Sequence, residues 1–337
     1  MAAKPNAITI SVSGEGGRVG PAAASSSGGA KDAAAKSTFH VALAIAAYAT
    51  ASSLMLIVNK LAVHFLPAPG TVLVFQLLTT AAAVVMSSQM GVISAEPLEW
   101  SKIKPFLLVV FAFLGAVFTN LKVLQYANVD TFIVFRSSTP LVICVFDYLF
   151  LGRQLPSLRS WSSLLLILTG AIVYVLSDKE FEVTAYTYVA AWFAIFCFDQ
   201  IYIKHVCDTV VMSNWGRVYY TNALAIPPAM FMAFLYGEHN ELGSFEWNNN
   251  SILALTASCI CGIGMSYTAF WLRATVSATS FTVVGIVCKF ATIVINCLIW
   301  DKHASPLGLA GLVLCLTAGS FYKQAPMRDD KVKGVGH

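Results

Sequence analysis

Charged residues are scarce in this chain, at 11% of its 337 residues, whereas hydrophobic residues make up 57%. A soluble domain normally carries about 25% charged residues. The net charge is only +4, and the basic residues are scattered between apolar segments, so nothing indicates binding to nucleic acid. The composition therefore excludes a soluble protein over most of the length and predicts a polytopic protein embedded in a lipid bilayer.

Acidic residues and histidines are also scarce inside the apolar segments. Asp147 and Asp199 are the acids within them, and every histidine falls at a loop, a segment end or a tail. A catalytic centre, a metal site or a proton relay would need a cluster of such groups. The cysteines lie inside or next to apolar runs, as small fillers do, without the spacing of a disulfide or zinc framework. We expect no enzyme activity and no cofactor.

Residues 1–38 are rich in Ala, Gly and Ser and show no apolar periodicity. Such a segment cannot bury a core, so we expect a disordered tail. Its composition differs from a secretory signal, whose short apolar region lies within about the first 30 residues. Residues 326–337 form a second, shorter tail.

Ten apolar runs are long enough to cross a bilayer, which takes roughly 20 residues per helix. The sequence therefore predicts an all-α membrane protein with ten transmembrane helices and short connections. The runs lie at 40–63, 70–91, 105–125, 131–150, 161–177, 185–203, 218–236, 251–271, 279–299 and 306–323.

The distribution of Lys and Arg predicts the orientation. With ten spans both tails face one side, and the loops on that side hold most of the basic residues. The opposite loops hold only Lys179 and Lys302 among the basic residues, together with acids that include Asp178, Glu180, Glu182, Glu238, Glu241 and Glu246. The positive-inside rule then places both termini in the cytosol. The sequon at Asn249 falls on the non-cytosolic side.

An internal repeat relates the two halves of the chain. Phe132-Ile133-Val134 aligns with Phe281-Thr282-Val283, and at the same offset Arg153 aligns with Lys302 and Gly170 with Gly319. A unit of five helices enters the membrane upside down in its second copy, so residues 39–183 and 184–325 are expected to form two inverted five-helix repeats. In transporters this architecture places a binding site at the membrane midplane.

Lys289 is the most informative residue, because it lies in the middle of an apolar run with no neighbouring acid. An ammonium near the bilayer midplane costs roughly 3 kcal/mol or more unless it faces water or an anion. Lys binds phosphate as a point charge. We therefore expect Lys289 to bind a phosphate group in a cavity between the two halves.

Other polar residues are weaker candidates. Arg136 lies inside the fourth run, where it either gates access or adds positive charge. Tyr219, Tyr220, Thr221 and Asn222 open the seventh run; tyrosine rings stack on a nucleobase and an Asn amide pairs with its edge. The alternative for the tyrosines is an aromatic belt at the membrane surface.

Small residues in the eighth and ninth runs leave two interpretations open. Ser266 follows Gly262 and Gly264, and Gly285 lies one turn before Lys289. Small side chains either let helix backbones pack closely or leave room for a ligand.

Three segments resemble plant nucleotide-sugar transporters of the GDP-mannose transporter group, in the drug/metabolite transporter superfamily. They are 128–137 (NVDTFIVFRS), 202–205 (YIKH) and 296–303 (NCLIWDKH), and the resemblance extends over residues 40–325. It implies a Golgi carrier that exchanges a cytosolic nucleotide sugar for a lumenal nucleoside monophosphate by alternating access. A homodimer is a candidate assembly.

Two motifs of that family are present with changes. The resemblance implies that a Phe-Tyr-Asn-Asn motif holds the base and a Gly-Ala-Leu-Asn-Lys motif holds the sugar and phosphate; here they are Tyr219-Tyr220-Thr221-Asn222 and Gly285-Ile286-Val287-Cys288-Lys289. Ser266 matches a family serine, and Phe281 replaces a tyrosine. Thr221 and Cys288 each replace an amide, and sites built on hydrogen bonds discriminate strongly. A GDP-sugar and a UDP-sugar such as UDP-N-acetylglucosamine therefore both stay open.

Two other classes compete with this function. A phosphorylated-sugar/phosphate antiporter of the plastid translocator kind would need a transit peptide, and the N-terminal tail contains few Arg and two acids. A membrane enzyme or a receptor-like protein would need a catalytic cluster or a large exposed loop, and the sequence shows neither.

Overall fold

The computed structural model describes residues 26–126, 129–175, 183–240, 247–299 and 306–328. Within these ranges the chain is helical apart from its connections and one isolated antiparallel bridge between Arg153 and Met327. The helices are α1 (Ser26–Phe65), α2 (Pro69–Gln89), α3 (Trp100–Tyr126), α4 (Val129–Phe150), α5 (Leu158–Val175), α6 (Val183–Thr209), α7 (Asn214–Leu235), α9 (Asn249–Thr275), α10 (Ala278–Ile299) and α11 (Pro306–Phe321).

Each of the ten apolar runs coincides with one of these helices. In the part of the chain that the structure describes, six helices are long and apolar enough to cross a membrane. These candidate spans are Thr38–Phe65, Pro69–Gln89, Trp100–Asn120, Thr187–Thr209, Asn214–Leu235 and Asn249–Thr275. The all-helical membrane class is therefore confirmed.

The first helix, α1, begins at Ser26, within the segment that was expected to form the N-terminal tail. The segment contains the run Ala33-Ala34-Ala35 between Lys31 and Lys36. Alanine has the highest helix propensity, and a helix, unlike a domain, needs no buried core to form. Residues 1–25 lie outside the described ranges.

Local signals explain where the helices begin and end. Ser213 accepts a hydrogen bond from the Gly216 backbone N–H and caps α7, and Asn248 forms a reciprocal capping box with Ser251 at the start of α9. Gly91 and Gly237 follow α2 and α7 with φ of 71° and 76°, which side chains with a Cβ disfavour.

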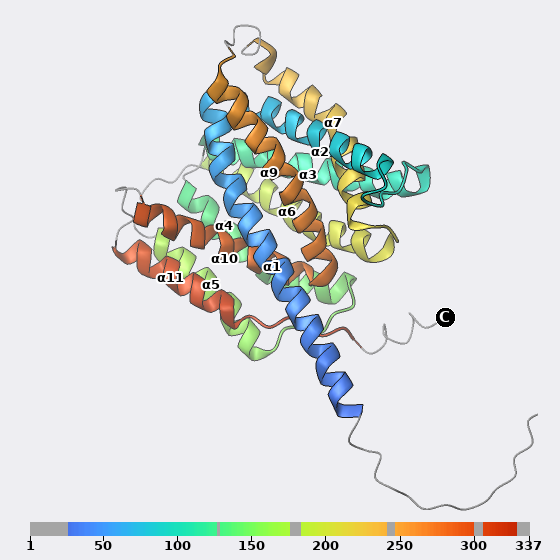
Figure 1. Ribbon diagram of the computed structural model, residues 1–337. Coiled ribbons are helices and arrows are strands. Elements are labelled where there is room, and N and C mark those ends of the chain that lie inside the picture. The colour runs from blue at the N-terminus through green and yellow to red at the C-terminus, as the bar shows by residue number, and fades with distance from the viewer. Residues whose placement is uncertain (1–25, 127–128, 176–182, 241–246, 300–305, 329–337) are drawn as a thin grey trace, which may run out of the picture. The chain divides into compact units, whose positions relative to one another are not determined.

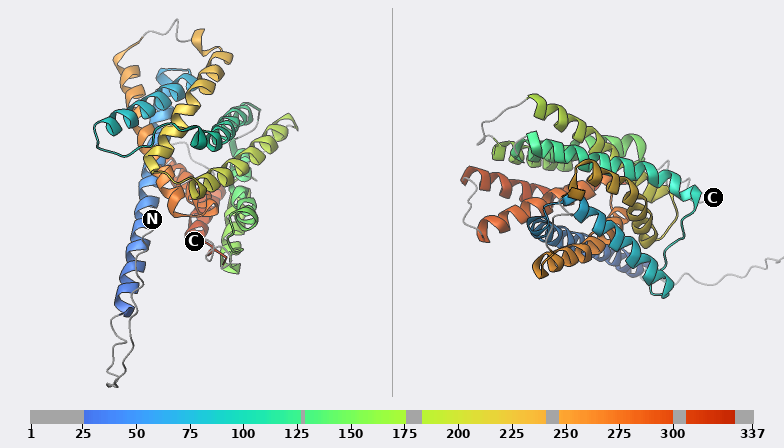
Figure 2. Two further views of the ribbon diagram at one scale, coloured as in Figure 1. Left: turned by 90° about the vertical axis from the view of Figure 1, so that its right-hand side faces the viewer. Right: turned by 90° about the horizontal axis from the view of Figure 1, so that it is seen from above.

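The helices pack in pairs that bring together distant parts of the chain. The most extensive pairings are α5 with α11, α3 with α6 and α2 with α7. Figure 1 shows α5 and α11 side by side, and the α3–α6 pairing can be followed in Figure 2. Lipid tails are as apolar as leucine, so close packing rather than exclusion of water holds such pairs together.

Two buried clusters each combine helices from both halves of the sequence. One joins α3, α6, α7 and α9 around Phe106, Val206, Tyr220 and Phe270. The other joins α4, α5, α10 and α11 around residues such as Ile167. The halves are therefore interleaved rather than separate, and residues far apart in sequence can line one cavity.

Large apolar side chains cover outward faces of several helices. Phe111, Phe231 and Leu253 are more than half exposed. Soluble monomers rarely expose extensive apolar surface. These faces are suited to lipid, in agreement with the composition.

Candidate functional site

A cavity of about 290 Å³ lies among α1, α2, α3, α6, α7 and α9, and we call it the central cavity. Apolar side chains such as Leu73, Phe113 and Met265 form much of its wall. Small-molecule sites of this mixed kind usually measure about 300–1,000 Å³. The polar and charged side chains that line it are Gln76, Thr80, Asp199, Thr221, Asn222, Ser266 and Arg273.

Several polar atoms at this cavity have no hydrogen-bond partner within the described part of the chain. They are Oγ1 of Thr80, Oδ1 of Asp199, Oγ1 of Thr221 and Nε of Arg273. Buried polar groups in proteins are nearly always paired. Their concentration at one cavity indicates a place where a polar ligand completes the pairing.

Three of the residues predicted from sequence meet here: Thr221, Asn222 and Ser266. Asn222 is 5% exposed, and its amide N–H donates to the Val218 carbonyl at 2.8 Å. That bond holds the amide in place on α7, next to the hydroxyl of Thr221. The structure thus brings the predicted base and sugar contacts of two helices to one cavity.

Gln76, another residue that lines the cavity, belongs to a polar triad. The Gln76 amide on α2 donates to Asn59 Oδ1 on α1 at 2.9 Å and to Ser258 Oγ on α9. Ser258 Oγ also donates to Asn59 Oδ1 at 2.7 Å. These bonds orient Gln76 at the cavity and tie three helices together.

A second, smaller cavity has a volume of about 20 Å³. Three more predicted residues line it, Arg136, Phe281 and Gly285, together with Tyr48. The Arg136 guanidinium lies 5.2 Å from the centre of the Phe196 ring. A Cβ at Gly285 would lie 3.5 Å from the Tyr48 hydroxyl, an ordinary contact, so this glycine leaves only modest space.

Two contacts connect the small cavity to the central one. Gln200, which lines the small cavity, donates to Asp199 Oδ2 of the central cavity at 2.9 Å. Phe281 of the small cavity lies 3.9 Å beneath the Arg273 guanidinium of the central one. The two cavities are therefore neighbours that share a wall of α6, α9 and α10.

Tyr220, predicted to hold the base, lies outside the residues that line the central cavity. It is fully buried, and its ring packs against Phe106 with centroids 5.4 Å apart. Its hydroxyl accepts from the Glu99 backbone N–H at 2.8 Å and donates to the Pro97 carbonyl. Tyr219 is partly buried beside it. In the structure Tyr220 therefore ties α7 to the connection between α2 and α3.

Lys289 belongs to α10, but its side chain lies outside the part of the chain that the structure describes. The preceding residue, Cys288, lines a hollow of about 810 Å³ among α1, α10 and α11. The walls of that hollow are mainly aliphatic, from residues such as Ile45, Val283 and Val287. An apolar groove of this kind suits lipid tails better than a charged solute, so the smaller central cavity is the better candidate site.

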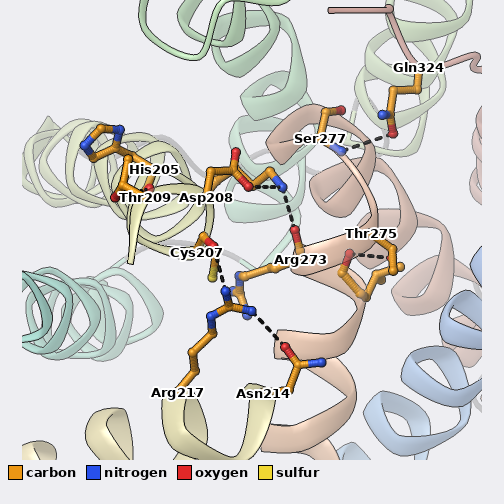
Figure 3. A network of polar contacts seen from close by, with 12 residues as sticks. His205, Cys207, Asp208, Thr209, Asn214, Arg217, Arg273, Thr275, Ser277 and Gln324 are labelled. Carbon is orange, nitrogen blue, oxygen red and sulfur yellow. Dashed lines mark hydrogen bonds and ion pairs between the residues drawn. The ribbon is translucent and has the colours of Figure 1, made fainter. Parts of the chain in front are cut away.

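Two basic residues near the ends of α6 and α7, Lys204 and Arg217, connect helix ends through polar contacts (Figure 3). The charge pattern of the sequence assigns both residues to the same side of the membrane. Lys204 contacts Asp208 Oδ1 at 2.8 Å and donates to the Arg273 carbonyl at 2.8 Å. Arg217 donates to the Cys207 carbonyl at 2.7 Å and to Asn214 Oδ1 at 2.9 Å. Lys204 and Arg217 are both buried, and both lie where α6 and α7 extend beyond their apolar runs.

Three carboxylates cap the first turns of helices from other parts of the chain. Asp147 Oδ2 accepts from the backbone N–H and hydroxyl of Thr279 at the start of α10, at 3.0 and 2.6 Å. Asp147 on α4 thus joins its helix to the start of α10. Glu96 caps α7 and Glu238 caps α2 in the same way, as the favourable field at a helix N-terminus allows.

A profile of the Triose-phosphate Transporter family matches residues 39–323, nearly all of the helical region. The chain belongs to this family. Membership confirms the expected resemblance and identifies a transporter rather than an enzyme.

Relatives within the Triose-phosphate Transporter family carry names for nucleotide sugars. GDP-fucose transporter 1 of Arabidopsis thaliana is 40% identical and covers 86% of each chain. GDP-mannose transporter GONST3 of the same plant is 36% identical, over 84% of this chain and 78% of its own. UDP-galactose/UDP-glucose transporter 7, also from Arabidopsis thaliana, is 25% identical over 86% of this chain and 91% of its own.

A solved crystal structure shares the fold of this family member. It superposes with a TM-score of 0.63 over 88% of this chain and 99% of its own, at 14% identity. At that identity the match shows the fold alone.

Sequence reasoning missed Gln76 and Arg273 as cavity residues. Gln76 is a lone polar residue in an otherwise apolar run, which is a usable signal for a buried polar contact. Arg273 lies just beyond the end of the eighth apolar run, where the sequence alone predicts a loop charge. The structure instead directs its side chain inward, over Phe281.

Proposed function

We propose that this chain exchanges a nucleotide sugar for a nucleoside monophosphate across the Golgi membrane by alternating access, with both termini in the cytosol. Two relatives above 30% identity are named for GDP-fucose and GDP-mannose, and a more distant one for UDP-galactose and UDP-glucose. Both exchanged ligands share a base, a ribose and a phosphate, so one site serves both.

The observation that carries the proposal is the central cavity itself. Helices α1, α2 and α3 of residues 39–183 face α6, α7 and α9 of residues 184–325 across it. A site between two repeats, with a few polar side chains in apolar walls, is the arrangement that allows alternating access.

Several of the helix pairings support ten spans arranged as two inverted five-helix repeats. In such a fold α2 corresponds to α7, α3 to α9, α4 to α10 and α5 to α11. The α2–α9 contact then has its counterpart in α7–α3, and α4–α5 in α10–α11. The pairs α2–α7, α4–α10 and α5–α11 join corresponding helices directly, as contacts on a two-fold pseudo-axis would.

Roles follow from position for the predicted residues. Asn222 and Thr221 contact the base, and Ser266 contacts the sugar, because all three line the central cavity. Lys289 neutralises the phosphates. Phe281, Gly285 and Arg136 form the adjoining wall. Tyr219 and Tyr220 position α7, and Cys288 occupies the place of a family amide.

Exchange in vesicles tests the proposal. Purified full-length protein is reconstituted, preloaded with GMP or UMP, and supplied with labelled GDP-fucose, GDP-mannose, UDP-galactose, UDP-N-acetylglucosamine and a CMP-sugar. We expect uptake of at least one nucleotide sugar that depends on the monophosphate inside. Uptake of none of them would overturn the proposal.

An alternative function is exchange of phosphorylated sugars for phosphate, favoured by the description of the family whose profile matches the chain. Vesicles loaded with inorganic phosphate distinguish it. Uptake of a triose phosphate without uptake of nucleotide sugars would support this alternative.

A further inference from the structure

Arg273 presents its side chain to the central cavity from the last turn of α9. Its guanidinium carbon lies 3.9 Å from the centre of the Phe281 ring and 5.9 Å from that of Phe270. Its backbone carbonyl accepts from Lys204, which anchors the helix end without the Arg273 side chain (Figure 3). The aromatic face therefore orients the guanidinium, while the end of α9 is held independently.

The charge of Arg273 is not neutralised by a direct partner. Within the described ranges it forms no salt bridge, and its buried Nε has no hydrogen-bond acceptor. Asp199 interacts with it electrostatically across the cavity wall. Asp199 is 5% exposed; one carboxylate oxygen accepts from Gln200 and the other has no partner in the described part.

This arrangement has the chemistry of an anion site. A buried donor without an acceptor is costly, and a charge in a membrane protein usually faces its ligand. A guanidinium over the face of an aromatic ring leaves the N–H groups at its edge free to donate, and their fork matches two oxygens of a phosphate. Thr80 and Thr221 add hydroxyls with no other partner in the described part.

We propose that Arg273 binds a phosphate group of the transported nucleotide in the central cavity. The proposal rests on the function proposed above and adds a phosphate contact distinct from Lys289. Asp199 is a positioning residue. When the site is empty, its carboxylate balances the charge of Arg273, and when a phosphate binds, the two anions compete for the Arg273 guanidinium. Removal of the Asp199 charge is therefore expected to strengthen phosphate binding.

Paired competitors isolate the phosphate contact. In reconstituted vesicles, GMP and guanosine, or UMP and uridine, compete with labelled nucleotide sugar in the wild type and in Arg273→Gln. We expect the half-inhibitory concentration of the monophosphate to rise about 10- to 100-fold in the variant. That of the nucleoside should stay unchanged, because it lacks the phosphate.

Two further variants complete the series. Arg273→Lys keeps the charge and should retain part of the preference for the monophosphate. Arg159→Gln is the matched control, because Arg159 is exposed and rests on Phe321 in a similar cation–π contact far from the cavity lining. Arg159→Gln should leave the half-inhibitory concentrations of both the monophosphate and the nucleoside unchanged.

Two results overturn the proposal. One is an unchanged half-inhibitory concentration of the monophosphate in Arg273→Gln. The other is an equal rise in the half-inhibitory concentrations of monophosphate and nucleoside, which indicates a merely structural role. If that variant does not fold, Asp199→Asn supplies the test, since it should lower the half-inhibitory concentration of the monophosphate alone. An unchanged value there overturns the proposal as well.

A binding measurement separates failure of this proposal from failure of the proposed function. Thermal stabilisation of the detergent-solubilised protein by GMP or UMP, relative to the nucleoside, needs no transport. If the wild type exchanges nothing yet gains phosphate-dependent stabilisation that Arg273→Gln loses, the phosphate site stands without the transport function. If the wild type shows no phosphate-dependent stabilisation, the proposal for Arg273 fails.

Discussion

Glu238, which follows α7, accepts hydrogen bonds from the backbone N–H and the hydroxyl of Thr71 at the start of α2, at 2.6 and 2.9 Å. Glu96, which follows α2, accepts from the backbone N–H and hydroxyl of Ser213 at the start of α7, at 2.7 and 2.9 Å. Each helix of this pair is thus capped by a carboxylate that follows the other. Loss of either cap is expected to loosen both helices.

The Glu238 cap is expected to contribute measurably to stability. Glu238 is buried and also accepts from the Gly70 N–H at 2.9 Å, so Glu238→Gln removes a charge that completes three hydrogen bonds. Bonds of this kind are worth about 1–3 kcal/mol in total when a buried partner is lost. Thermal unfolding in detergent should show a clearly lower Tm.

The matched control for that change is Glu99→Gln. Glu99 makes an exposed salt bridge to Lys102, at 3.1 Å, and such pairs contribute about 0–1 kcal/mol. Equal losses of Tm for the two variants would contradict a specific role of the cap.

The Glu96 cap is expected to depend on pH. Burial acts to raise the pKa of Glu96, but the hydrogen bonds from Ser213 outweigh it and hold the pKa below its ordinary value of 4.5. A lowered pKa in the folded state stabilises the protein above the ordinary value, and the benefit is lost as pH falls through the folded-state pKa. The Tm difference between wild type and Glu96→Gln should persist above about pH 5 and vanish in more acidic solution.

Gly216→Ala probes the same cap at neutral pH. A Cβ there would lie 2.0 Å from Glu96 Oε2, so the carboxylate must leave its position. Gly216→Ala should have the same lowered Tm as Glu96→Gln. The part of the wild-type Tm that falls on acidification should be absent from this variant. A pH profile like that of the wild type would show that Glu96 does not form this contact.

The base preference is expected to follow Thr221 and Asn222. Asn222→Ala should reduce uptake of the preferred nucleotide sugar roughly 10- to 100-fold, since a site built on hydrogen bonds is left unpaired. Thr221→Asn restores the second amide of the family motif and should shift preference toward GDP-sugars over UDP-sugars. Competition by GMP and UMP measures both effects.

Tyr220→Phe provides the contrast for the base site. It removes only the hydroxyl that pairs with Glu99 and Pro97. We expect a lower Tm with an unchanged ratio of GMP to UMP inhibition. A changed ratio would return Tyr220 to the base site.

Lys289→Ala is expected to abolish exchange while the protein still folds. Removing one partner of a buried charge contact costs about 2–5 kcal/mol, or roughly 30-fold or more in affinity. Lys60→Ala is the control, because Lys60 lies exposed on α1. Normal uptake by Lys289→Ala, with a normal elution profile, would remove this lysine from the site.

The sequence by itself determined the helical class, the positions of the ten helices and the family. Length and hydropathy suffice for the class and the helix positions, because an apolar helix satisfies its own backbone hydrogen bonds and about 20 residues cover roughly 30 Å of hydrocarbon. The family followed from the motif segments instead. It also selected Thr221, Asn222 and Ser266, which the structure places at one cavity. These residues stand out because polar groups are costly in an apolar run unless they have a partner.

Only the tertiary structure decided which way the remaining side chains face. Arg273 looks like a loop charge in sequence, yet its side chain lines the central cavity, and Tyr220 looks like a ligand contact, yet its hydroxyl pairs with the α2–α3 connection. The reciprocal caps by Glu96 and Glu238 join residues more than a hundred positions apart. Hydropathy records how apolar a helix is, but the rotation of a helix about its axis and the identity of its neighbours come from packing between helices.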